Sequence, residues 1–162
     1  MRRFALFLLA AAVACSPQVQ DQPAAGQAVL VPAEARHPVS GLEIIPLSIT
    51  QDGKVHHFRV EVARTGEEQA RGLMFRTEMG ADEGMIFPRN PPGVASFWMR
   101  NTVIPLDMIF IGTDGRILNI AANTVPYSLD SRRSEGIAMA VLELNGGRAA
   151  ELGIEPGARV EW

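Results

Sequence analysis

Two carboxylates in this chain stand among apolar residues, and each needs a partner if its surroundings are buried. Asp107 lies in LDMIFIG and Glu143 lies in VLEL. An unpaired charge inside a protein is costly, so hydrogen-bond donors or counter-charges must lie nearby. For Asp107, Arg100 is the nearest candidate in the sequence, Arg76 is a second, and the Asn101 amide is a further donor.

An aromatic side chain stands beside these polar groups, because Trp98 opens the stretch WMRNTVIPLD. An indole can cover the apolar face of a ligand while charged and amide groups fix its orientation. This mixture suits a small polar ligand such as a sugar, a peptide end or a carboxylate. The candidate ligand-binding residues are Arg76, Trp98, Arg100, Asn101, Asp107 and Glu143.

The same residues are compatible with several roles. Asp107 and Arg100 could simply pin the tight connection between them, or the whole set could line a ligand site. Asp107 and Glu143 could instead divide acid and base roles in a hydrolase acting on a cell-envelope glycan or peptide. Nothing in the sequence sets the separation of the two carboxylates, so the catalytic residues of that alternative stay unknown. A flat apolar patch would indicate an interaction surface for another envelope component.

Signatures of other chemistries are missing from the sequence, which contains neither G-x-S-x-G nor H-E-x-x-H. The methionines lack the close spacing of a copper site, and His56 and His57 would point to opposite faces of a strand. His37 is expected to be solvated. The glycines fall at turns and form no phosphate-binding loop. We therefore predict no metal ion and no cofactor.

The first fourteen residues, MRRFALFLLAAAVA, have the layout of a signal peptide. Cys15, the single cysteine, follows them directly in a pattern similar to a bacterial lipobox, although Ala12 stands where leucine is usual. Two outcomes follow: lipidation of Cys15 and anchoring to the outer membrane, or ordinary cleavage and secretion. Cleavage leaves 13 basic and 18 acidic residues, a net charge of −5. With no basic run, this balance argues against nucleic acid.

Residues 15–41 are rich in Pro, Gln and Ala and predict a flexible tether between lipid and domain. Residues 42–162 are enough for one domain. In that domain, Thr65 and Glu68 fit a capping box that opens a helix ending before Gly72, and Asn145 is expected to cap a second helix at 146–152. The predicted strands cover 42–50, 54–63, 84–87, 93–99, 106–112, 116–123, 136–144 and 158–162. The expected fold is mainly β, a jelly-roll-like sandwich or partly open barrel with two short helices.

The order of several motifs resembles one family. VEVARTGEEQARGLMFR is followed by GMIF, by FWMRNTVIPLDMIFIGTDGRI, by Asn123-x-x-Pro126 and by VLELNGGRAAELGIEPGARV. This order is similar to the family called domain of unknown function 192, DUF192. Asn145 and Ala158 depart from its usual Pro and Asp near the C-terminal turn. The resemblance implies a single β-rich domain and no established activity. We therefore expect a periplasmic, lipid-anchored module that binds a small polar ligand or an envelope component.

Overall fold

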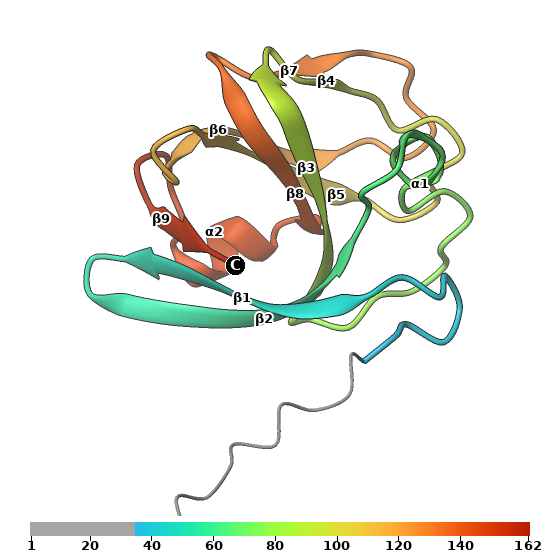
Figure 1. Ribbon diagram of the computed structural model, residues 1–162, viewed down its shortest axis with the longest axis horizontal. Helices are drawn as coiled ribbons and strands as arrows, with labels where there is room; N and C mark the ends of the chain where they lie inside the picture. The colour runs from blue at the N-terminus through green and yellow to red at the C-terminus, as the bar shows by residue number, and fades with distance from the viewer. Residues whose placement is uncertain (1–34) are drawn as a thin grey trace, which may run out of the picture. The chain divides into compact units, whose positions relative to one another are not determined.

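The computed structural model describes residues 35–162, which form a mainly β domain with two short helices (Figure 1), as the sequence predicted. Seven strands make one mixed sheet in the order β6-β5-β8-β3-β2-β1-β9, and β4 and β7 form a separate two-stranded ribbon. The elements are β1 (Ile44–Gln51), β2 (Lys54–Val62), α1 (Gly66–Arg71), β3 (Glu83–Gly93), β4 (Ser96–Phe97), β5 (Leu106–Gly112), β6 (Ile117–Thr124), β7 (Arg132–Arg133), β8 (Ala138–Asn145), α2 (Arg148–Leu152) and β9 (Arg159–Glu161).

Helix α1 connects β2 to β3, which pair in parallel. A parallel connection must carry the chain back along the sheet, and a helix does this compactly. The expected capping box is confirmed: the Thr65 hydroxyl accepts from the Glu68 amide, and the Glu68 carboxylate accepts from the Thr65 amide. The C-cap, Gly72, has a φ of 47°, and a Cβ there would meet the Phe87 ring at 3.3 Å. Because Gly72 has no side chain, the end of α1 can pack closely against Phe87 of β3.

Strand β3 is longer than the sequence predicted. We expected it to end at Phe87 before a proline-rich turn, but it continues to Gly93. Its pairing with β8 shifts register between Pro88 and Gly93, and this irregularity accommodates prolines that cannot donate to a ladder. The strand expected over 93–99 is correspondingly reduced to β4, whose partner β7 was not predicted because Arg132 and Arg133 show no apolar alternation.

Both faces of the central strands are covered. Alternate residues of β5 enter different clusters: Leu106, Met108 and Phe110 belong to one, and Ile109 and Ile111 to the other. We call the first cluster, which also contains Met85, Phe87 and Met99, the Met85 core. Apolar residues occupy nearly every position, and their side chains point alternately to the two faces. This pattern is typical of a strand buried on both sides.

The two edges of the sheet approach each other without closing it into a barrel. An isolated bridge joins Arg116, just before β6, to Arg159 of β9, and the Ile117 amide donates to the Ala158 carbonyl at 2.9 Å. The α1 helix and the β4–β7 ribbon stand on the same side of β3 and β8 (Figure 1). No helix within residues 35–162 is long and apolar enough to cross a membrane.

Candidate functional site

Glu143 is a buried carboxylate without a partner. It lies on β8, opposite Met85 of β3 and Met108 of β5, and its side chain therefore shares the face of the Met85 core. Glu143 is 5 % exposed, and no group within residues 35–162 forms a hydrogen bond or ion pair with its carboxylate. Burial raises the pKa of Glu143 to about 8. At neutral pH the group is therefore largely a neutral acid, able to donate one proton.

Glu143 lines a pocket of about 480 Å³, the size of a site for a small organic molecule. This Glu143 pocket is formed by residues 66, 69–74, 87, 89, 96–98, 100, 102 and 143. The chain from α1 to Met74 provides one wall, and the β4 segment provides another. Phe97 packs edge-on against Phe87, with ring centroids 5.1 Å apart, and thereby links β4 to β3. The pocket thus lies where the helical connection and the two-stranded ribbon meet the Met85 core.

Three arginines line the Glu143 pocket: Arg71, Arg89 and Arg100. None of them has an ion pair with a carboxylate in the described part of the chain. The Nε atom of Arg89 is buried without a hydrogen-bond partner. This is unusual, because buried donors are nearly always paired in proteins. The pocket therefore combines unpaired positive groups with one uncharged acid.

Trp98 stands at the wall of the Glu143 pocket and is 50 % exposed. The guanidinium carbon of Arg100 lies 5.8 Å from the centroid of the indole, within the range of a cation–π contact. Arg100 is thus held beside an open aromatic surface. Of the six residues predicted for the site, the structure brings Trp98, Arg100 and Glu143 together at this pocket.

Asp107 lies elsewhere. It is fully buried and points to the face opposite Glu143, because it neighbours Met108, the cross-strand partner of Glu143. Its carboxylate accepts from the amides of Asn123 at 2.6 Å, Gly147 at 2.8 Å and Ala149 at 2.8 Å. The expected pairing with Arg100 or Arg76 is wrong, because main-chain amides satisfy the charge. Asp107 joins β5 to the end of β6 and the start of α2, so it pins the fold.

The N-cap of α2 differs from the one that we expected from the sequence. Gly147, not Asn145, is the N-cap residue, and it has no capping side chain of its own. Asp107 supplies the acceptor from a distant strand instead. The Asn145 amide is turned away and donates to the carbonyls of Met79 and Gly80 at 3.0 and 2.9 Å. The sequence pattern located the helix but not the group that caps it.

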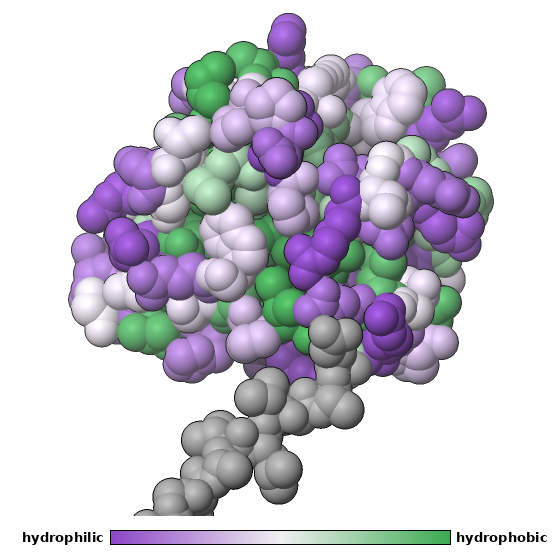
Figure 2. Space-filling model, viewed as in Figure 1, coloured by the Kyte–Doolittle hydropathy of each residue, from purple (hydrophilic) through white to green (hydrophobic). Residues whose placement is uncertain are grey.

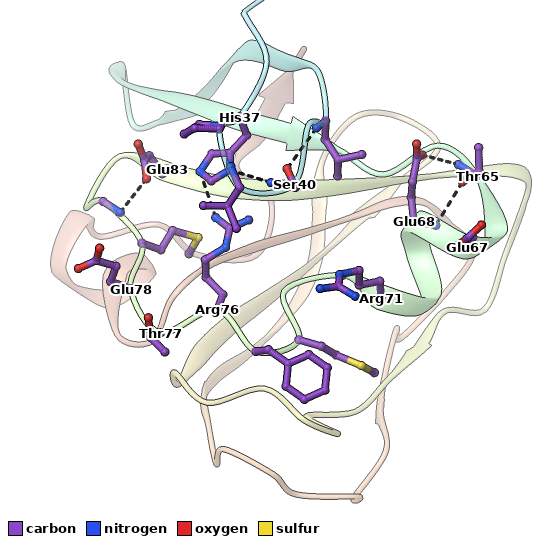
Figure 3. A pocket seen from close by; sticks show the side chains of 18 residues that line it. His37, Ser40, Thr65, Glu67, Glu68, Arg71, Arg76, Thr77, Glu78 and Glu83 are labelled. Carbon is purple, nitrogen blue, oxygen red and sulfur yellow. Dashed lines mark hydrogen bonds between the residues drawn. The ribbon is translucent and has the colours of Figure 1, made fainter.

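Arg76 and Asn101 do not line the Glu143 pocket. Arg76 is paired with the buried Glu61 at 2.9 Å, and its guanidinium also lies 3.2 Å from the His37 ring. His37, which we expected to be solvated, is instead half-buried, and its ring lies 3.7 Å from the Glu61 carboxylate. Figure 3 shows His37 beside Arg76. Asn101 has a φ of 55°, and its carbonyl accepts from the Phe75 amide at 2.8 Å. Both residues position the loops around the pocket.

Arg76 lines a second, larger hollow of about 1130 Å³, shown in Figure 3. Four of its titratable side chains have partners within the protein, namely His37, Glu68, Arg76 and Glu83, whereas Glu67, Arg71 and Glu78 are exposed to solvent. Glu83 accepts from the Gly80 amide at 2.9 Å, and the amides of Thr65 and Arg64 lower the pKa of Glu68. Paired charges leave less for a ligand to satisfy. The Glu143 pocket is the stronger candidate site, although it is smaller, because its unpaired carboxyl is buried, whereas the unpaired charges of the larger hollow are exposed to water.

Sequence reasoning missed Arg71 and Arg89. Arg71 follows the charged surface pattern of a short helix, and Arg89 lies within the proline-rich stretch that we expected to be a turn. Neither position carries a local signal of function. Only the continuation of β3 and the parallel connection through α1 bring them to the wall beside Trp98.

Comparison with known proteins identifies the family. Residues 47–162 match the model of DUF192, described as an uncharacterised family, and the chain belongs to it. A protein of unknown function from Novosphingobium aromaticivorans is 61 % identical, with a TM-score of 0.79 over 82 % of this chain and 94 % of that one. A Sinorhizobium meliloti protein with a provisional description as a transcription regulator is 36 % identical, with a TM-score of 0.72 over 80 % of this chain and 97 % of that one. No protein of curated function matches significantly.

Replacing Asp107 should test its pinning role. Asp107→Asn substitutes a donor for one acceptor oxygen and leaves buried amides unpaired, so we expect the free energy of unfolding to fall by about 3 kcal/mol in urea titration. Asp114→Asn is the matched control, because Asp114 accepts a single amide, from Arg116, in an exposed turn. A loss for Asp107→Asn no larger than that of the control would contradict the pinning role.

The raised pKa of Glu143 makes a separate prediction about stability. Between its ordinary value of 4.5 and about 8, the folded protein holds a proton that the unfolded chain releases, so ionisation destabilises the wild type as pH rises. Glu143→Gln should therefore become progressively more stable than the wild type, by roughly 3 kcal/mol between pH 5 and pH 8. Urea unfolding across that range measures the difference. The exposed Glu135→Gln should show no such trend, and an equally flat difference for Glu143→Gln would rule out an unpaired carboxylate.

Proposed function

We propose that the domain is a small-ligand-binding module whose site is the Glu143 pocket. The observation that carries this proposal is the unpartnered Glu143 carboxyl in the wall of an open pocket. A buried acid that the protein itself leaves without a partner costs stability. Such groups are common in functional sites, where a ligand supplies the missing interaction.

The walls of the pocket suit a ligand with an apolar body. Leu73, Phe87, Phe97 and Trp98 contribute apolar surface, and Glu143 and the arginines contribute polar contacts. Small-molecule sites combine apolar walls with a few polar groups that orient the ligand, and this pocket offers both kinds of surface in similar measure. Trp98 supplies a flat, half-exposed surface against which a ring could stack.

Binding is favoured over hydrolysis by the position of the two carboxylates. A two-carboxylate mechanism requires the groups to face each other across the substrate, but Asp107 and Glu143 lie on opposite faces of the sheet. Within the described residues, Glu143 is the single carboxylate that lines this pocket. An interaction surface is less well supported, because apolar residues on the face seen in Figure 2 form several patches interrupted by hydrophilic residues.

A thermal-shift screen of the full chain, purified in detergent, tests the binding function. The panel contains monosaccharides, dipeptides and small carboxylates. We expect at least one class to raise the melting temperature of the wild type. In Trp98→Ala the affinity for that ligand should fall about tenfold, because the stacking surface is lost.

Trp162→Ala is the control for this screen, since Trp162 is also partly exposed but lies outside the pocket. It should bind as the wild type does. If no compound stabilises the wild type, or if Trp98→Ala binds as tightly as Trp162→Ala, the Glu143 pocket is not the ligand site.

We also propose that the mature protein is held in the bacterial envelope by lipid on Cys15. The support is the sequence of residues 1–15, which lies outside the described residues. In a bacterial host, the wild type should incorporate labelled palmitate and fractionate with membranes, whereas Cys15→Ala should do neither. Equal mature masses and equal solubility of the two proteins would instead indicate ordinary signal-peptidase cleavage.

A further inference from the structure

We infer that the Glu143 pocket binds an uncharged ligand through a cis-amide group, in which an N–H and a C=O lie on the same side and pair with the Glu143 carboxyl. Primary amides and lactams contain this group. The inference rests on the proposed binding function and specifies the chemistry of the ligand. It depends on the accessibility, the surroundings and the hydrogen-bonding capacity of one unpaired carboxyl.

The Glu143 carboxyl can be reached from the pocket. Within residues 35–162, the buried side-chain nitrogen and oxygen atoms that lack both a partner and accessible surface belong to His56, Arg89 and Arg148. The Glu143 oxygens also lack a partner, but they are not among these atoms, so they retain a small accessible surface. Because Glu143 lines the pocket, that surface faces the space that a ligand would occupy. The buried Arg89 Nε takes no part in this contact.

The surroundings of the carboxyl favour an uncharged ligand group. Its cross-strand neighbours are Met85 and Met108, and Leu73 lines the same pocket. Burial alone raises the pKa of Glu143 to about 8, and no arginine of the pocket counteracts this rise, so no guanidinium stands close to the carboxyl. A ligand carboxylate at this point would therefore have no counter-charge. An ammonium group would require Glu143 to ionise among apolar side chains.

The hydrogen-bonding capacity of a neutral carboxyl matches a cis-amide. A protonated Glu143 offers one O–H donor beside one C=O acceptor. A cis-amide presents the complementary C=O and N–H in the same arrangement, so two hydrogen bonds form and neither oxygen of Glu143 stays unpaired. A single hydroxyl would pair with one oxygen and leave the other without a partner. A sugar would bring further hydroxyl groups to this apolar end of the pocket, where they would lack partners.

Cyclic dipeptides illustrate the class of ligand that we infer. They contain cis-amides, whereas linear dipeptides have a trans amide and ionised ends. Their apolar side chains also suit the pocket walls formed by Leu73, Phe87, Phe97 and Trp98. Among the dipeptides of the thermal-shift panel, cyclic ones should therefore stabilise the wild type more than linear ones.

Matched aromatic probes test the assignment. We would titrate the full chain in detergent with benzamide, isoindolinone, N-methylbenzamide, benzoate and benzyl alcohol, and follow amide chemical shifts by NMR at pH 6.5. Benzamide and isoindolinone have a cis N–H and should bind about tenfold more tightly than the other three, which lose a hydrogen bond or bring a charge. Isoindolinone and N-methylbenzamide both carry a carbon substituent on nitrogen, so the size of that substituent cannot explain a difference between them.

Ionisation of Glu143 should weaken the binding of benzamide. The ionised carboxyl has no O–H, and one of its oxygens would face the amide carbonyl. The residues opposite Glu143 on the neighbouring strands are apolar. The other ionisable groups that line the pocket are Arg71 from α1, Arg89 from β3 and Arg100 from the segment after β4, and arginines stay charged throughout. The dissociation constant of benzamide, which is itself neutral, should therefore rise about tenfold between pH 7 and pH 9.

Variants of Glu143 assign the effect to its carboxyl. Glu143→Leu, which suits the apolar surroundings, should abolish the preference for benzamide over N-methylbenzamide. Glu143→Gln should restore that preference, because its side chain also has an N–H beside a C=O, and should remove the pH dependence. The exposed Glu135→Gln is the control and should behave as the wild type. If Glu143→Leu does not fold, the pH profiles of the wild type and Glu143→Gln still test the inference.

The outcomes separate this inference from the proposed function. If N-methylbenzamide, benzoate or benzyl alcohol binds at the pocket as tightly as benzamide, the cis-amide assignment is overturned and a ligand site remains. A benzamide affinity that stays constant through pH 9, or a preference for benzamide that persists in Glu143→Leu, would also overturn it. If no probe shifts the signals of pocket residues, the inference fails, and the proposed function then depends on the thermal-shift screen alone.

Discussion

Burial of both faces of the central strands is the constraint on which the rest of the structure depends. The middle residues of β3, β5 and β8 lie between two apolar clusters, so a polar side chain at one of these positions is largely removed from bulk water. Such a group must find a partner within the fold or remain unsatisfied. Asp107 and Glu143 lie on opposite faces of the sheet. The Asp107 carboxylate accepts hydrogen bonds within the fold, whereas the Glu143 carboxyl has no partner.

On one face, Asp107 connects separate parts of the chain. Three amides from separate parts of the chain converge on its carboxylate, so the start of α2 and the end of β6 are held at the same point. A short helix has little stability of its own. The Asp107 carboxylate therefore caps the N-terminus of α2, although it lies on a strand remote in sequence. The pinning interpretation of Asp107 describes this interaction correctly, although the partners are amides and not arginine.

On the other face, Glu143 is left unsatisfied where the cover is incomplete. The connection through α1 and the two-stranded ribbon close over most of the Met85 core but leave a pocket between them. The unpaired guanidinium groups gather at that opening. An unpaired buried acid lowers the stability of the fold. The same sheet thus carries a fully hydrogen-bonded carboxylate on one face and an unpaired carboxyl on the other.

Local patterns in the sequence determined the fold class, the capping box at Thr65 and the approximate bounds of most strands. These features depend on neighbours a few residues apart, where turn chemistry and alternation act directly. The sequence also singled out Trp98, Arg100 and Glu143. It could not show that Asp107 faces away from them, that Arg89 joins them, or that His37 folds back onto Glu61. Those facts follow from strand order and register, which are set by the packing of segments far apart in the chain. Tertiary structure alone decided which charges were paired, and therefore which acid remained without a partner.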